Sequence, residues 1–113
     1  KNMINYDKFD SLPEQVVAAY RETGCRPATH RISGNCLCAI GVMGKKDDKQ
    51  GYDWADEFFE NRMFTNLFFK GFDDPNSEKE TQEYWGDDYE SYFFHLGTNT
   101  RRAVEAEFGV INV

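Results

Sequence analysis

The stretch "NCLCAIGVMG", residues 35–44, is the most apolar run of the chain, and the fold prediction depends on it. As a strand, it would be buried on both faces. As a helix, it has one apolar face, made of Cys36, Ala39, Ile40 and Met43, and Gly44 is its expected end. Two glycines weaken a strand more than a closely packed helix, so we favour the helix. In both cases we expect a buried segment on which the N-terminal helix packs.

Residues 11–24 carry the clearest helical signal before this stretch. Ser11 and Glu14 have the spacing of a capping box, and Pro13 is tolerated in a first turn. Apolar residues then recur at helical spacing up to Gly24, a typical helix stop.

Residues 52–74 carry two apolar faces that point in opposite directions if one helix is continued through the segment. The change of phase falls at residues 61–62, which predicts two short helices with a break there. We expect Gly71 to end the second of them.

The C-terminal part predicts an exposed acidic loop and two further helices. The loop covers residues 73–88, with a short helical piece near 80–84. Helical periodicity returns over 87–97 and again over 98–109, where residues 98–100 provide the expected cap and Gly109 the stop.

Taken together, these segments predict a mainly α, compact single domain over residues 1–113, with about five helices. An α+β fold with a small two-stranded piece near residues 28–42 is the alternative. Ten Phe, six Tyr and two Trp make 16% of the chain aromatic, and disordered chains are poor in such residues. We therefore expect an ordered core.

The net charge of −7 is distributed unevenly. Residues 47–90 hold fourteen acidic and four basic side chains, whereas residues 1–46 carry a net positive charge. An acidic surface repels phosphate, which argues against direct binding of nucleic acid. The same surface attracts a basic protein.

Three cysteines, Cys25, Cys36 and Cys38, and the absence of an apolar signal-peptide core predict a reducing, cytoplasmic location without disulfides. No apolar run has the length of a transmembrane helix, so we expect no membrane association.

Four potential zinc ligands lie within fourteen residues: Cys25, His30, Cys36 and Cys38. Zinc binds four nitrogen or sulfur donors, but this spacing lacks the usual knuckle and places Cys38 in an apolar run. Packing of the thiols is therefore the favoured interpretation, and zinc is the alternative. Nothing in the sequence orients a base for a cysteine nucleophile. We expect no catalytic residue and no cofactor.

The acidic stretch also contains aromatic residues, and Tyr and Trp beside charges are enriched at protein interfaces. The predicted partner-binding residues are Asp73, Asp74, Glu78, Glu80, Glu83, Tyr84, Trp85, Asp87, Asp88 and Glu90. Tyr84 and Trp85 are the expected anchors. Asp73 has a structural alternative, which is to cap the next turn or to bond Arg101 or Arg102.

Three stretches, "CLCAIGVMG", "FFKGFDD" and "GTNTRRAVEAEFG", together resemble a loose group of small uncharacterised bacterial and phage proteins. In that group an N-terminal helix leads to a CxC-x-[IL]-G stretch. An aromatic helix ending in GFD follows, and then a terminal helix that opens near a G…R pair. The resemblance covers about two thirds of the chain. It implies a phage or prophage origin, where small acidic proteins often inhibit host defence, as anti-CRISPR proteins do.

The sequence therefore predicts a non-enzymatic, DNA-mimicking inhibitor that binds a basic, nucleic-acid-binding protein. A small Cys/His zinc domain and a structural or assembly protein, such as a homodimer, are the alternatives.

Overall fold

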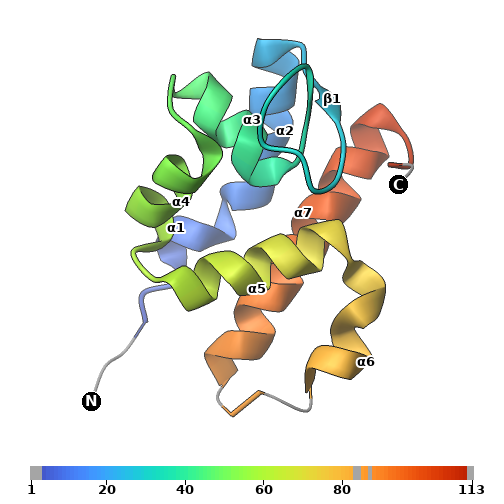
Figure 1. Cartoon of the computed structure of the whole chain (residues 1–113). Coiled ribbons are helices and arrows are strands. Elements are labelled where there is room, and N and C mark those ends of the chain that lie inside the picture. Colours follow the sequence, from blue (N-terminus) through green and yellow to red (C-terminus); the bar gives the residue numbers. More distant parts are fainter. Residues whose placement is uncertain (1–3, 83–84, 87, 112–113) are drawn as a thin grey trace.

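The computed structural model describes residues 4–82, 85–86 and 88–111 (Figure 1). The α-helices of this part are α1 Asp7–Asp10, α2 Leu12–Thr23, α3 Ala39–Lys46, α4 Gly51–Phe59, α5 Arg62–Asp73, α6 Glu78–Thr81 and α7 Asp88–Phe108. A short 3-10 helix, η1, covers Pro75–Ser77, and the strands β1 Arg26–Pro27 and β2 Cys36–Leu37 pair in parallel. The prediction of a mainly α fold is confirmed. The small two-stranded piece of the alternative is also present, although β1 precedes the expected range of 28–42, and the described part of the chain has seven α-helices instead of about five.

The apolar stretch 35–44 divides into a strand and a helix. Its residues 37–44 are buried and α3 packs on α2, as expected. Cys36, by contrast, lies in β2 and is exposed, so its predicted place on a helical face is wrong. Gly44 does not end the helix either. A Cβ at Gly44 would lie 2.8 Å from the backbone nitrogen of Gly51, so the glycine lets α3 and the start of α4 approach closely.

Helix α2 follows its prediction except at its N-terminus. Gly24 ends the helix at φ 71°, a left-handed conformation that favours glycine. Ser11, however, makes no side-chain cap bond, and its hydroxyl accepts a hydrogen bond from the Gln15 amide at 2.8 Å instead. The predicted capping box is wrong, because Ser11 also ends α1 and has a ψ of 0° rather than the extended backbone of a cap.

The predicted break within residues 52–74 is confirmed. Glu60 ends α4 at φ 58°, and Asn61 caps α5 by accepting hydrogen bonds from the backbone of Met63 at 2.8 Å and Phe64 at 3.3 Å. Helix α5 then continues past Gly71, the expected end, to Asp73.

The two helices expected over 87–97 and 98–109 are one helix, α7, of 21 residues. Thr98 and Thr100 do not cap a second helix. Their hydroxyls bond the carbonyls of His95 at 3.0 Å and Leu96 at 2.7 Å within α7. Although α7 is long, none of the described helices combines the length and the apolar character that crossing a membrane requires.

Helices α5 and α7 cross at two glycines (Figure 1). A Cβ on Gly97 would lie 2.9 Å from the Cα of Gly71 and would overlap the Phe68 carbonyl. Around this crossing the core is largely aromatic, with fully buried Phe68, Phe72 and Phe93. The short distance between the two backbones therefore fixes where both helices lie.

We predict that Gly97→Ala destabilises the protein by about 3 kcal/mol, because the added methyl group has no space at the crossing. Chemical denaturation followed by circular dichroism measures this change. Alanine is intrinsically the better helix former, so a loss of stability reports the contact alone. Asn99→Ala, an exposed position on the same helix, is the matched control and should change stability by less than about 1 kcal/mol. Equal effects of the two substitutions would contradict the assignment.

Candidate protein-interaction site

A largely apolar groove of about 380 Å³ lies between α5 and the segment that leads from α6 into α7. It is lined by Met63, Asn66, Leu67, Lys70, Thr81, Trp85 and Glu90. Met63 and Leu67 lie one turn apart on α5, so helical periodicity puts them on the same side. Met63 is 50% exposed, which is unusual for a large apolar side chain. The groove thus offers apolar surface that the fold leaves uncovered.

Trp85, a predicted anchor, forms one side of the groove and is half-buried. Its ring centroid lies 5.6 Å from that of Phe94 and 6.1 Å from that of His95, so two residues of α7 support the indole. The indole Nε1 is buried, and among the described residues it has no hydrogen-bond acceptor.

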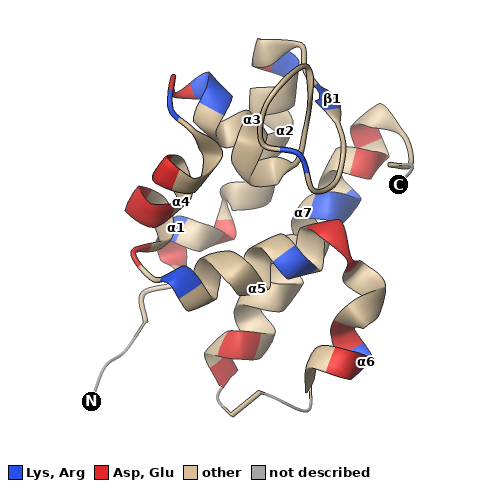
Figure 2. Cartoon of the chain, in the orientation of Figure 1, with Lys and Arg blue, Asp and Glu red and all other residues tan. Residues whose placement is uncertain are grey.

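Acidic residues lie on the elements that border the groove, and Figure 2 shows them on α6 and at the start of α7. Glu80 and Asp88 are exposed and form no ion pair with the part of the chain that the structure describes. Asp74 pairs with Lys70 at 3.7 Å, and Glu78 lies 3.0 Å from the ring of His95. These four carboxylates place negative charge around an apolar centre.

Two predicted contact residues, Asp73 and Glu90, are buried, and of these two Glu90 lines the groove. Glu90 is 8% exposed, and its carboxylate accepts a hydrogen bond from the Gly86 backbone, which fixes the turn before α7. Asp73 is 4% exposed at the end of α5. The predicted residues Glu83, Tyr84 and Asp87 lie outside the described residues.

No described side chain donates a hydrogen bond to the buried carboxylate of Asp73. This side chain is 1% exposed, and Nδ1 of the His30 ring lies 3.5 Å from its Oδ2. Burial raises the pKa of Asp73 to about 6, although His30 and Arg101 act in the opposite direction. The expected bond to Arg101 exists, but it goes to the backbone: Nη1 of Arg101 donates to the carbonyl of Phe72 at 2.9 Å and to that of Asp73 at 3.3 Å.

The alternative zinc ligands are not assembled. Cys25 and Cys38 are buried, Cys36 is exposed, and His30 lies next to Asp73. Nowhere in residues 4–82, 85–86 and 88–111 do three Cys, His, Asp or Glu side chains form a group that could hold a metal ion. Burial and the neighbouring Asp73 raise the pKa of the Cys38 thiol to about 12, so this cysteine stays protonated and is not a nucleophile.

A second acidic surface on α4 differs from the groove in that most of its charges are neutralised. Asp56 pairs with Arg62, Glu57 with Lys49, and Glu60 with Lys8. Paired surface carboxylates attract a partner less strongly than free ones. We therefore consider the groove, and not α4, as the main candidate.

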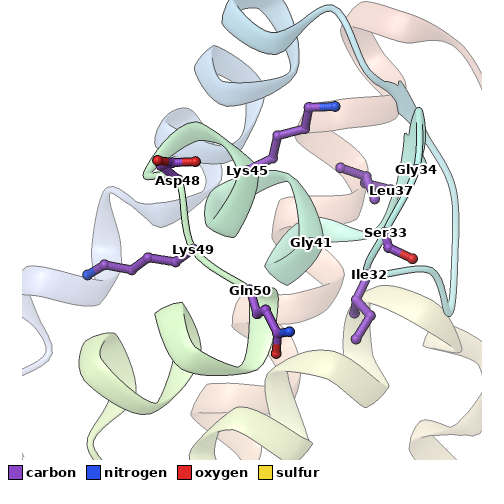
Figure 3. Close-up of a pocket in the computed structure, with 9 residues that line it drawn as sticks. All are labelled: Ile32, Ser33, Gly34, Leu37, Gly41, Lys45, Asp48, Lys49 and Gln50. Carbon is purple, nitrogen blue, oxygen red and sulfur yellow. The ribbon is translucent and has the colours of Figure 1, made fainter.

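A different pocket, of about 440 Å³, lies between α3, the loop before β2 and the loop before α4 (Figure 3). Gly41 lies between these loops, and a Cβ there would come within 2.9 Å of the Arg31 carbonyl. Asp48 and Lys49 lie on one side, and Ile32 and Ser33 on the other (Figure 3). Ser33 therefore lies across the pocket from Asp48 and Lys49, and no hydrogen bond among the described residues joins it to a base, so the pocket gives no indication of catalysis.

Sequence reasoning missed the part of the groove that α5 provides. The predicted partner-binding residues include none from α5, whereas Met63, Asn66, Leu67 and Lys70 line the groove. His95, which holds Glu78 in place, was also missed. The spacing of Asn66 and Lys70 beside Met63 was the available signal that this edge of α5 faces solvent.

Neither the protein-family models, nor the curated proteins, nor the solved structures with which the chain was compared gave a match. The functional argument therefore depends on the residues themselves.

We predict that Asp73→Asn stabilises the protein at pH 7.5 by about 2 kcal/mol. A carboxyl group whose pKa is raised to about 6 on folding binds its proton more tightly in the folded state. As the pH rises from about 4 to 6, the unfolded state releases this proton first, so the free energy of unfolding of the parent protein falls. The stability advantage of the Asp73→Asn variant over the parent protein should accordingly disappear near pH 4.

Urea denaturation of both proteins at several pH values measures this difference. Asp53→Asn, which removes an exposed carboxylate from α4, is the control and should give a nearly constant difference. If Asp73→Asn destabilised the protein most strongly at pH 7.5, the contacts of the carboxylate with His30 and Arg101 would outweigh the cost of burial.

Proposed function

We propose that this protein is a non-enzymatic binding protein that binds a basic, nucleic-acid-binding protein. It does so with the apolar groove and the acidic residues beside it, which together form the acidic groove. The observation that carries the proposal is a largely apolar groove lined by Trp85, with Glu80 on α6 and Asp88 at the start of α7, two exposed carboxylates that form no ion pair with a described residue. An apolar centre with a charged rim is the usual anatomy of a protein interface. The complementary partner surface has an apolar side chain between lysines or arginines.

Trp85 is the expected anchor of the interface. It is an aromatic residue with an N–H that no described residue satisfies, and it is held by contacts with α7. Tryptophan is enriched among the residues that provide most of the binding energy at interfaces. An anchor that is already held in place loses little entropy on binding.

The partner's basic surface is the kind that proteins use to bind nucleic acid, so occupation by this protein blocks that binding. The carboxylates take the place of phosphates. Together with the resemblance to small phage proteins, this favours an inhibitor of a host defence protein, as anti-CRISPR proteins are. Long-range charge then provides much of the encounter rate, and affinity falls with salt.

We predict that the tagged protein captures a nucleic-acid-binding protein from bacterial lysate at low salt, and that DNA competes with it for the captured protein. Trp85→Ala should weaken the binding of the purified partner about tenfold, and Glu80→Lys with Asp88→Lys by at least as much. Titration calorimetry at two salt concentrations measures these affinities.

The matched control is Asp53→Lys with Glu57→Lys on α4, which changes the net charge by the same amount at a different surface. Equal weakening by the two charge pairs would show that net charge, and not the groove, is recognised. Binding that DNA does not affect would rule out mimicry. If only the protein's own chain is captured, and sedimentation gives a dimer, the assembly alternative is correct.

A further inference from the structure

A further pocket, at the opposite end of α7 from the groove, is lined by two arginines. It has a volume of about 430 Å³ and lies between the strand pair, the loop that joins the strands, and the segment that follows α7. Its lining residues are Arg26, Pro27, Ala28, Arg31, Cys36, Phe108, Gly109, Val110 and Ile111. No Asp or Glu is among these described lining residues, in a protein of net charge −7.

The two arginines of this pocket are distinct from the other arginines of the described chain. Arg21, Arg62 and Arg101 each pair with a carboxylate, and Arg102 donates to the side chain of Asn99 at 2.8 Å. Neither Arg26 nor Arg31 forms an ion pair or a side-chain hydrogen bond with a described residue. Two guanidinium groups without partners in one concave site are suited to an anion that accepts several hydrogen bonds.

The backbone that carries these arginines is held firmly. The Arg26 N–H donates to the Asn35 carbonyl at 2.9 Å, and the Arg31 carbonyl accepts from the Cys38 N–H at 2.8 Å. The backbone of Arg31 and Ile32 lies directly on α3 at Gly41, where a side chain would not fit. The two charges are therefore presented by a fixed frame, which lowers the entropic cost of binding a ligand.

The opposite wall of the pocket is apolar. Phe108 is 39% exposed and Val110 78%, although both are large apolar side chains. Gly109, at φ 93°, turns the chain out of α7. Both backbone polar groups of Ile111 are then hydrogen-bonded. Its N–H donates to Glu105 at 2.8 Å, and its carbonyl accepts from Arg101 at 3.2 Å. This wall is thus as well fixed as the basic one.

We propose that this pocket binds a small organic anion, with a carboxylate or phosphate group on Arg26 and Arg31 and an apolar body against Phe108 and Val110. Charge selects the head group, and the exposed apolar wall selects a ligand that carries a ring or an alkyl group. The site does not depend on the acidic groove, so the two proposals can fail separately.

The first test is an amide NMR titration of the whole protein with phenyl phosphate and benzoate, alongside phenol and inorganic phosphate. We expect saturable shifts around residues 26–36 and 108–111, with phenyl phosphate or benzoate binding about tenfold tighter than phenol. The comparison of the two anions distinguishes phosphate from carboxylate ligands. Arg26→Gln with Arg31→Gln should weaken binding about tenfold or more, and Arg102→Gln, outside the pocket, should not.

Cys36 provides a second readout, because it is the exposed cysteine of the pocket while Cys25 and Cys38 are buried. Its thiolate attacks 5,5′-dithiobis(2-nitrobenzoate), an anionic aromatic disulfide, to form a mixed disulfide and release one aromatic thiolate. The rate of the same thiol is measured with the neutral disulfide 4,4′-dithiodipyridine. The ratio of the two rates then removes any change in the intrinsic reactivity of Cys36. Removing both arginines should lower the ratio several-fold, and phenyl phosphate should protect Cys36.

The proposal is overturned if no ligand gives saturable shifts at the pocket, or if phenol binds as tightly as the anions. It is also overturned if the double arginine variant, shown to be folded by circular dichroism, keeps the affinity and the reagent ratio of the parent protein.

Discussion

The contact on which the rest of the structure depends is the close approach of α5 and α7 at Gly71 and Gly97. With no side chain on either residue, the backbones of the two helices meet, and the Phe side chains on both sides of the crossing interlock. Dispersion contacts in such an interior are lost quickly when atoms move apart, so the geometry has little freedom. Both candidate sites are set by this crossing, since α7 carries one at each of its ends.

The crossing also explains why Asp73 is buried. Helix α5 does not stop at Gly71, because that glycine is needed in the helix for the contact, and the chain therefore carries Asp73 into the protein before it turns. Arg101, one turn beyond Gly97 on α7, then reaches the free carbonyls at the end of α5. A guanidinium bound to the last carbonyls of a helix is a favourable arrangement, and it compensates in part for the carboxylate that is buried beside it.

Much of the fold could be predicted because local signals and tertiary packing agree. Gly24 ends α2, the phase change near Asn61 separates two helices, and Gly109 ends α7, each in a way that the residue type alone dictates. Three errors in the helix boundaries have one cause. Gly44, Gly71 and Gly97 are of the residue type that most often ends a helix, but here they allow close packing on another segment, which for Gly71 and Gly97 is far away in the sequence. A single sequence does not show that partner.

The candidate site was predicted only in part for a related reason. The acidic residues were identified by composition, but composition does not distinguish Glu80, which faces solvent, from Glu90, which closes a turn. The groove itself needs two segments to be placed side by side, and only the fold provides this.

The groove and the arginine pocket lie at opposite ends of α7. Asp88 is exposed in the first turn of this helix, where the helix dipole favours negative charge. Near the other end, Glu105 is paired with Arg101 and Glu107 with Arg21. Because these carboxylates already have partners, Arg26 and Arg31 keep charges that no carboxylate of the described residues neutralises. The single long helix, which the sequence pattern divides in two, thus keeps the two candidate sites apart.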